Sequence, residues 1–151
     1  MTDLRKIIRK ARNFPDAESW AIDDPVSFEA ARLANIASRP ECTRHMDPQI
    51  RARVVADDVF SDVRFYRTHT AWRYSSPVIY WAAHDLDLAG HPEIVDRVGP
   101  YAHRWPFFEV RRDAARFRSM EEWRSLSPKG YRTAVRRQLL DHPGILAALK
   151  G

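Results

Sequence analysis

Three tryptophans divide this chain of 151 residues into nearly equal parts. Trp20, Trp72 and Trp123 lie 52 and 51 residues apart, and six other positions keep the same register around each of them. These positions are Phe14, Tyr66 and Phe117; Pro25, Pro77 and Pro128; Phe28, Tyr80 and Tyr131; Ala31, Ala83 and Ala134; Ile36, Leu88 and Leu139; and Pro40, Pro92 and Pro143. Because tryptophan and proline are uncommon residues, this register predicts a tandem repeat of about 51 residues.

Each predicted repeat contains three main helices and a short fourth one. Upstream of the tryptophan, apolar residues such as Leu4, Ile7 and Ala11 have the spacing of one helical face. A second helix carries the tryptophan and follows a residue of the N-cap type. A third helix begins at a proline that follows another such residue, which is typical of a helix start. The N-cap candidates are Asp16, Thr68 and Ser119 for the second helix, and Asp24, Ser76 and Ser127 for the third.

The repeat predicts the fold class. No stretch alternates apolar and polar residues as a strand does, and Asn-Gly and Asp-Gly hairpin signals are missing from the sequence. We therefore predict an all-α protein of three tandem helical repeats at residues 1–47, 48–99 and 100–151, each with a helix-turn-helix-like core. Because about 50 residues form only a marginal core, neighbouring repeats should bury surface against each other.

Composition narrows the class of protein. Hydrophobic residues make up 44% of the chain and charged residues 30%, which is enough to bury a core. The apolar runs fall well short of the ~20 residues of a membrane span, and the N-terminal residues lack a signal-peptide pattern. The single cysteine, Cys42, excludes an internal disulfide. We expect a cytoplasmic protein without membrane contact.

The third repeat resembles a known kind of module. Its sequence, ARFRSMEEWRSLSPKGYRTAVRRQLLDH, resembles the short helix-turn-helix-like repeats associated with phage and mobile-element endonucleases. The matching residues are Phe117, Ser119, Glu122, Trp123, Tyr131, Ala134, Leu139 and Leu140. The first repeat matches at Phe14, Trp20, Phe28, Ala30, Ala31 and Ile36, and the second at Tyr66, Thr68, Trp72, Tyr80, Ala82, Ala83 and Leu88. The resemblance implies an accessory DNA-binding role, here without a nuclease domain.

The net charge of +5 lies in the third repeat. Residues 1–51, 52–102 and 103–151 carry net charges of +1, −2 and +6. In the third helix of that repeat, the predicted core face is Tyr131, Ala134, Val135 and Leu139. The predicted nucleic-acid-binding residues are Lys129, Arg132, Arg136 and Arg137 on the other side, with Arg111, Arg112, Arg116 and Arg118 near the first helix. They suit phosphates or guanine edges of duplex DNA. The alternative is a solvated cationic face, balanced by Glu109, Asp113, Glu121 and Glu122.

The corresponding ridges of the first two repeats differ in chemistry. They carry Val26, Glu29 and Leu33 in the first repeat and Val78, Trp81 and Asp85 in the second. If exposed, Val78 and Trp81 would form a protein-binding or inter-repeat surface. This leaves a second hypothesis, an anti-CRISPR-like inhibitor that binds a host protein or ribonucleoprotein complex. A third is a structural repeat protein within a larger assembly.

Catalytic and metal-binding patterns are weak in this sequence. Glu41, Cys42, His45 and Asp47 lie close together, but one Cys-x-x-His pair does not make a zinc site. His84-Asp85 lacks the supporting residues of a metal phosphohydrolase. His91 and His142 both precede a proline, which suggests a capping role at the end of the preceding helix. Without a phosphate-binding glycine loop or a hydrolase motif, we predict a non-enzymatic protein with no metal and no cofactor.

Overall fold

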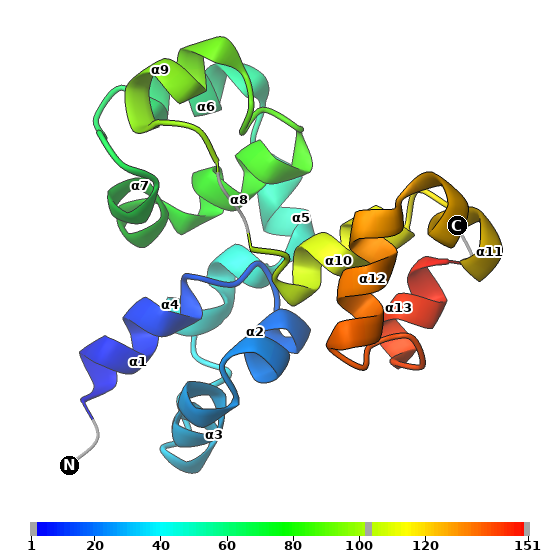
Figure 1. Cartoon of the computed structure of the whole chain (residues 1–151). Helices are drawn as coiled ribbons and strands as arrows, with labels where there is room; N and C mark the ends of the chain where they lie inside the picture. The colour runs from blue at the N-terminus through cyan, green and yellow to red at the C-terminus, as the bar shows by residue number, and fades with distance from the viewer. Residues whose placement is uncertain (1–2, 102–103, 150–151) are drawn as a thin grey trace. The chain divides into compact units, whose positions relative to one another are not determined.

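The computed structural model describes residues 3–101 and 104–149, and all regular structure within these ranges is helical (Figure 1). This confirms the all-α prediction. The chain forms two compact units, unit 1 at Met1–Ala102 and unit 2 at His103–Gly151. None of the helices in the described ranges has the length and apolar character needed to cross a bilayer.

The helices fall into three series, two in unit 1 and one in unit 2. The first series is α1 (Leu4–Ala11), α2 (Ala17–Asp23), α3 (Pro25–Leu33), α4 (Pro40–Thr43), the 3-10 helix η1 (Arg44–Met46) and α5 (Pro48–Arg51). The second is α6 (Ala56–Val63), α7 (His69–Ser75), α8 (Pro77–Asp85) and α9 (Pro92–Val98). The third is α10 (Phe107–Ala114), α11 (Met120–Leu126), α12 (Pro128–Arg136) and α13 (Pro143–Ala148).

The first three helices of each series match in length, whereas the fourth helices have four, seven and six residues. The first helices have eight residues, the second seven and the third nine. One residue, Asp24, Ser76 or Ser127, joins the second helix to the third, with φ between −136° and −141° and ψ between 59° and 68°. After each third helix a left-handed residue turns the chain, with φ of 58° or 59° at Asn35, Asp87 and Gln138. The three series therefore share their corners as well as their helices.

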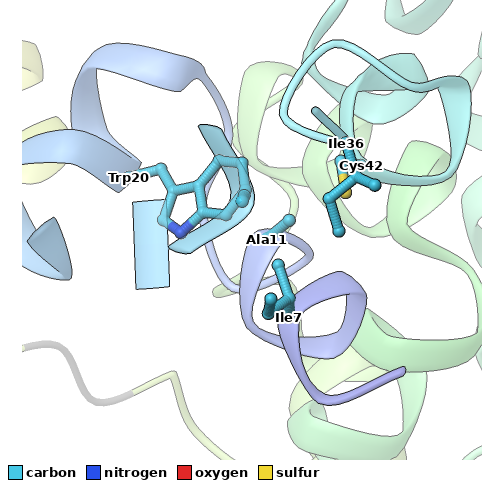
Figure 2. Close-up of a cluster of buried hydrophobic side chains, with 6 residues drawn as sticks. Ile7, Ala11, Trp20, Ile36 and Cys42 are labelled. Atoms are coloured by element: carbon cyan, nitrogen blue, oxygen red, sulfur yellow. The ribbon is translucent and has the colours of Figure 1, made fainter. Parts of the chain in front are cut away.

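The three tryptophans form the centres of the series. Trp20, Trp72 and Trp123 are almost fully buried, and Trp20 lies among Ile7, Ala11, Ile36 and Cys42 in Figure 2. A buried indole N–H needs an acceptor. The acceptors are Asp62 Oδ2 for Trp72 and Asp113 Oδ2 for Trp123, each at 2.8 Å and each ten residues earlier in the chain.

The first series meets the same requirement differently. Lys10 stands ten residues before Trp20, where the other two series have an aspartate. The indole of Trp20 donates instead to Ser27 Oγ at 2.8 Å, from the first turn of α3. A change of acceptor thus preserves the same buried tryptophan.

Trp81 joins the two series of unit 1. Its side chain is only 2% exposed, and its indole N–H donates to the carbonyl of Arg12 at 3.0 Å. The Arg12 guanidinium donates to the carbonyl of Tyr74 at 2.8 Å, and Arg51 pairs with Asp85 at 2.8 Å. Trp81 is therefore a contact between series inside unit 1 and is not exposed to another protein, whereas Val78 is partly buried.

His45 fixes the end of α1 from inside the core. It is 1% exposed, and its Nε2 lies 3.1 Å from the carbonyl oxygen of Ala11 and 2.8 Å from that of Phe14. Two acceptors at one nitrogen mean that Nε2 carries the proton. Burial and, to a smaller extent, the positive charges of Arg51 and Arg12 lower the pKa of His45 to about 4, although the hydrogen bonds to the carbonyls of Phe14 and Ala11 act in the other direction.

The burial of the three tryptophans predicts similar costs for their removal. Trp20→Ala, Trp72→Ala and Trp123→Ala should each lower the free energy of unfolding by about 3–5 kcal/mol, because each leaves a large cavity. Chemical denaturation of the three variants measures this. Wild-type stability in any one of them would show that its series does not depend on the indole.

The lowered pKa of His45 predicts loss of stability in acid. Below about pH 6.5 the unfolded chain binds a proton at His45 that the folded chain does not bind until about pH 4. The free energy of unfolding should therefore fall by up to about 3 kcal/mol between pH 7 and pH 4. In urea titrations His45→Gln should lack this part of the pH dependence, and an unchanged dependence would contradict the prediction.

Candidate nucleic-acid interface

All eight predicted nucleic-acid-binding residues lie in unit 2. In this unit α10 packs against both α12 and α13, and α11 packs against α12, as Figure 1 shows for the yellow, orange and red helices. Six of the eight are exposed, and Arg111 and Arg137 are partly buried. The six exposed residues are Arg112, Arg116, Arg118, Lys129, Arg132 and Arg136.

The buried face of α12 is made of small residues. Gly130, Thr133 and Ala134 are buried there, whereas Val135 is 48% exposed. The prediction of Val135 as a core residue is therefore wrong, and Thr133 takes its place. The reason is a close approach to α10, since a Cβ atom at Gly130 would lie 2.0 Å from Asp113 Oδ2.

Asp113 holds this part of unit 2 together. The carboxylate is 8% exposed, and its Oδ2 accepts hydrogen bonds from Trp123 Nε1 at 2.8 Å and Ser127 Oγ at 2.6 Å. Its Oδ1 pairs with Arg116 at 3.2 Å. Sequence reasoning placed Asp113 among solvated charges and missed this role. The sequence does contain a signal for this role: an aspartate stands ten residues before the tryptophan both here and in the second series, at Asp62 and Trp72.

The rotation of α12 exposes a ridge of three cations. Lys129, Arg132 and Arg136 are the second, fifth and ninth residues of the helix, a spacing that aligns them along one side. All three are exposed. Arg132 Nε has a hydrogen bond to the carbonyl of Pro128 at 3.3 Å, within its own helix. We call these three residues the α12 ridge.

Arg111 and Arg137 have contacts inside unit 2. The Arg111 guanidinium lies 5.4 Å from the centre of the Phe107 ring. The Arg137 guanidinium donates to the carbonyl of Trp105 at 2.8 Å. Both side chains therefore have a part in the packing of unit 2, unlike the α12 ridge.

The same three helix positions in unit 1 have another use. In α8 the second, fifth and ninth residues are Val78, Trp81 and Asp85. Trp81 and Asp85 bind Arg12 and Arg51 of the first series, as described above. In α12 the fifth and ninth positions carry Arg132 and Arg136. The side chains that hold two series together in unit 1 are therefore replaced by exposed cations in unit 2.

The acidic residues of unit 2 balance its positive charges only in part. Glu109 and Asp113 are both 8% exposed, so neither is a freely solvated counter-charge. Glu121 is exposed and Glu122 partly buried. With a net charge of +6 over residues 103–151, the surface of unit 2 is basic.

The other candidate sites have structural roles. His84 is buried among the rings of Tyr80, Trp81 and Tyr101. His91 and His142 accept hydrogen bonds at Nδ1 from the backbone N–H two residues later, so they cap the helix that follows and not the one before. Within residues 3–101 and 104–149 no three His, Cys, Asp or Glu side chains are grouped to hold a metal ion.

Comparison with known proteins adds no relative. No protein-family model, curated protein or solved structure matches the chain. The function is therefore inferred from the residues and the contacts described above.

The approach of α12 to Asp113 predicts that Gly130 cannot be enlarged. Gly130→Ala should lower the free energy of unfolding by about 2 kcal/mol despite the better helix propensity of alanine, because the buried carboxylate must move away from Trp123 and Ser127. Gly90→Ala is the matched control, since a Cβ there meets nothing within 4 Å. Equal thermal stability of the two variants would contradict the prediction.

Proposed function

We propose that this chain is a non-enzymatic DNA-binding accessory protein made of three tandem helical repeats of about 51 residues. The third repeat, unit 2, would contact the phosphate backbone of duplex DNA through the α12 ridge. The observation that carries the proposal is the row of exposed cations at helix positions that in α8 serve packing. A phage or mobile-element origin rests on the resemblance of the sequence to endonuclease-associated repeats.

Matching geometry supports the repeats. The three series share the lengths of their first three helices, a one-residue corner with similar φ and ψ, and a left-handed residue after the third helix. They also share a buried tryptophan with a hydrogen-bond acceptor. Unrelated helical segments have no reason to agree at all of these points.

The geometry of the corner favours backbone contact over base reading. In a helix-turn-helix the two helices are joined by three or four residues, and the second lies in the major groove. Here Ser127 alone joins α11 to α12. We therefore assign phosphate contacts to Lys129, Arg132 and Arg136 and no base-specific contact. Binding of this kind depends on the release of counterions and weakens steeply with salt.

Charge reversal on the α12 ridge tests the proposal. In a gel-shift series with duplex DNA, Arg132→Glu/Arg136→Glu should bind more weakly than wild type. The slope of log affinity against log salt should also shrink by about 2, because two phosphate contacts are lost. Arg39→Glu/Arg53→Glu in unit 1 changes the net charge equally at exposed positions and is the control.

Two results would overturn the proposal. One is weak, salt-insensitive binding that is the same in wild type and in the ridge variant. The other is an equal loss in the ridge and control variants, which would assign the effect to net charge alone and not to the α12 ridge.

A further inference from the structure

Unit 1 exposes large apolar side chains at two places, on α3 and in the turn after α6. On α3, Val26 is 79% exposed and Leu33 is 72% exposed. In the turn after α6, Phe65 is 82% exposed. Large apolar residues grouped at the surface commonly mark an interaction site. The contact between the two series of unit 1 indicates what these two groups are for.

That contact joins a turn of one series to two helices of the next. The turn after α1 contains Arg12 and Asn13. The guanidinium of Arg12 donates to the carbonyl of Tyr74, and the carbonyl of Arg12 accepts from the indole of Trp81. Asn13 Oδ1 accepts from Arg73 Nε at 3.0 Å. The turn after α1 therefore binds a face formed by α7 and α8.

Each exposed group corresponds to one half of this contact. Arg64 and Phe65 follow α6 at the places where Arg12 and Asn13 follow α1. The corresponding face of the first series is formed by Ile22 at the end of α2 and by the second, fifth and ninth residues of α3, which are Val26, Glu29 and Leu33. The second series of unit 1 thus presents a turn, and its first series a face, at the positions that make the contact between the two series.

The two halves are complementary in charge as well as in apolar surface. The turn carries the exposed arginines Arg64 and Arg67, and the guanidinium of Arg97 donates to the carbonyl of Arg64. The opposite face belongs to helices α2 and α3 with their corner, which hold the acidic residues Glu18, Asp23, Asp24 and Glu29 and one basic residue, Arg32. Glu29 pairs with Arg32, and Asp24 accepts a hydrogen bond from Ser27 Oγ, so the excess of acidic over basic residues there is three. A basic turn with an exposed aromatic ring suits an acidic face with exposed aliphatic side chains.

We propose that unit 1 binds a second copy of this chain head to tail. The turn at residues 64–67 of one copy packs on the α2–α3 face of the next, with Phe65 against Val26 and Leu33. Arg64 approaches Glu29, whose carboxylate it shares with Arg32 of the same helix. Each copy keeps a free turn or a free face, so the contact adds further copies. This inference rests on the correspondence between the series and not on DNA binding.

A two-fold symmetric dimer is disfavoured by the same charges. Pairing two turns would bring Arg64 and Arg67 against their own counterparts. Pairing two α2–α3 faces would bring acidic residues together. Like charges across an interface cost binding energy, so the head-to-tail arrangement is the one that the charges favour.

Sedimentation velocity on the full chain, free of nucleic acid, tests the inference. The mean mass of the wild type should rise with concentration and pass that of a dimer. Phe65→Glu and Leu33→Arg should each sediment as monomers, because each loses one half of the contact. Both residues are largely exposed, so both variants should keep the helical circular dichroism of the wild type.

A mixture of the two variants is the decisive experiment. Phe65→Glu keeps an intact face, and Leu33→Arg keeps an intact turn, so an equimolar mixture should form dimers and nothing larger. Leu126→Glu, a change of an exposed leucine in unit 2, is the control and should associate like the wild type.

Three outcomes would overturn the inference: a wild type that stays monomeric up to about 1 mM, a mixture that stays monomeric, or an equal loss of association in Leu126→Glu. The gel shifts measure DNA binding by the α12 ridge independently, because Arg132 and Arg136 take no part in the proposed contact between copies. Failure of self-association and failure of DNA binding are therefore distinguishable.

Discussion

Each series buries a tryptophan whose indole N–H needs a hydrogen-bond acceptor. In unit 2 the packing around α12 depends on how the indole N–H of Trp123 finds its acceptor. A dry core cannot leave that donor without an acceptor. In unit 2 the acceptor is Asp113, and its carboxylate fills the space beside α12 so closely that only glycine fits at position 130. Gly130 in turn fixes the rotation of α12. The side of α12 that bears Lys129, Arg132 and Arg136 therefore faces outward because the opposite side packs against the aspartate that accepts from Trp123.

Much of the helical framework is predictable from the sequence because its signals are local. N-cap residues and prolines mark where the second and third helices begin, and Asp16, Thr68 and Ser119 do cap the second helices through their side chains. The rotation of α12 is not local. Valine is more apolar than threonine, so Val135 looked like the core residue, but a buried carboxylate on α10 selects small residues instead. Side-chain polarity alone does not contain that information.

The candidate site was predictable in part for a similar reason. The cluster of cations in the last third of the chain is visible from composition, and six of the eight residues are exposed. The internal contacts of Arg111 and Arg137 depend on ring and carbonyl positions that no spacing rule gives. The burial of Trp81 is equally hard to predict, because the sequence pattern of an apolar residue on a helix is the same whether another segment or solvent covers its side chain. The carbonyl of Arg12 decides the matter, from 69 residues away.

The one-residue corners have a consequence for recognition. Two helices joined by a single residue have almost no freedom to change their angle, and Ser127 is held further by the carboxylate of Asp113. The backbone under Lys129, Arg132 and Arg136 is therefore ordered before any partner arrives. Only the outer bonds of three side chains lose freedom on contact, so little of the interaction energy is spent on conformational entropy. A short, rigid helix can in this way serve where a longer flexible segment would bind less tightly.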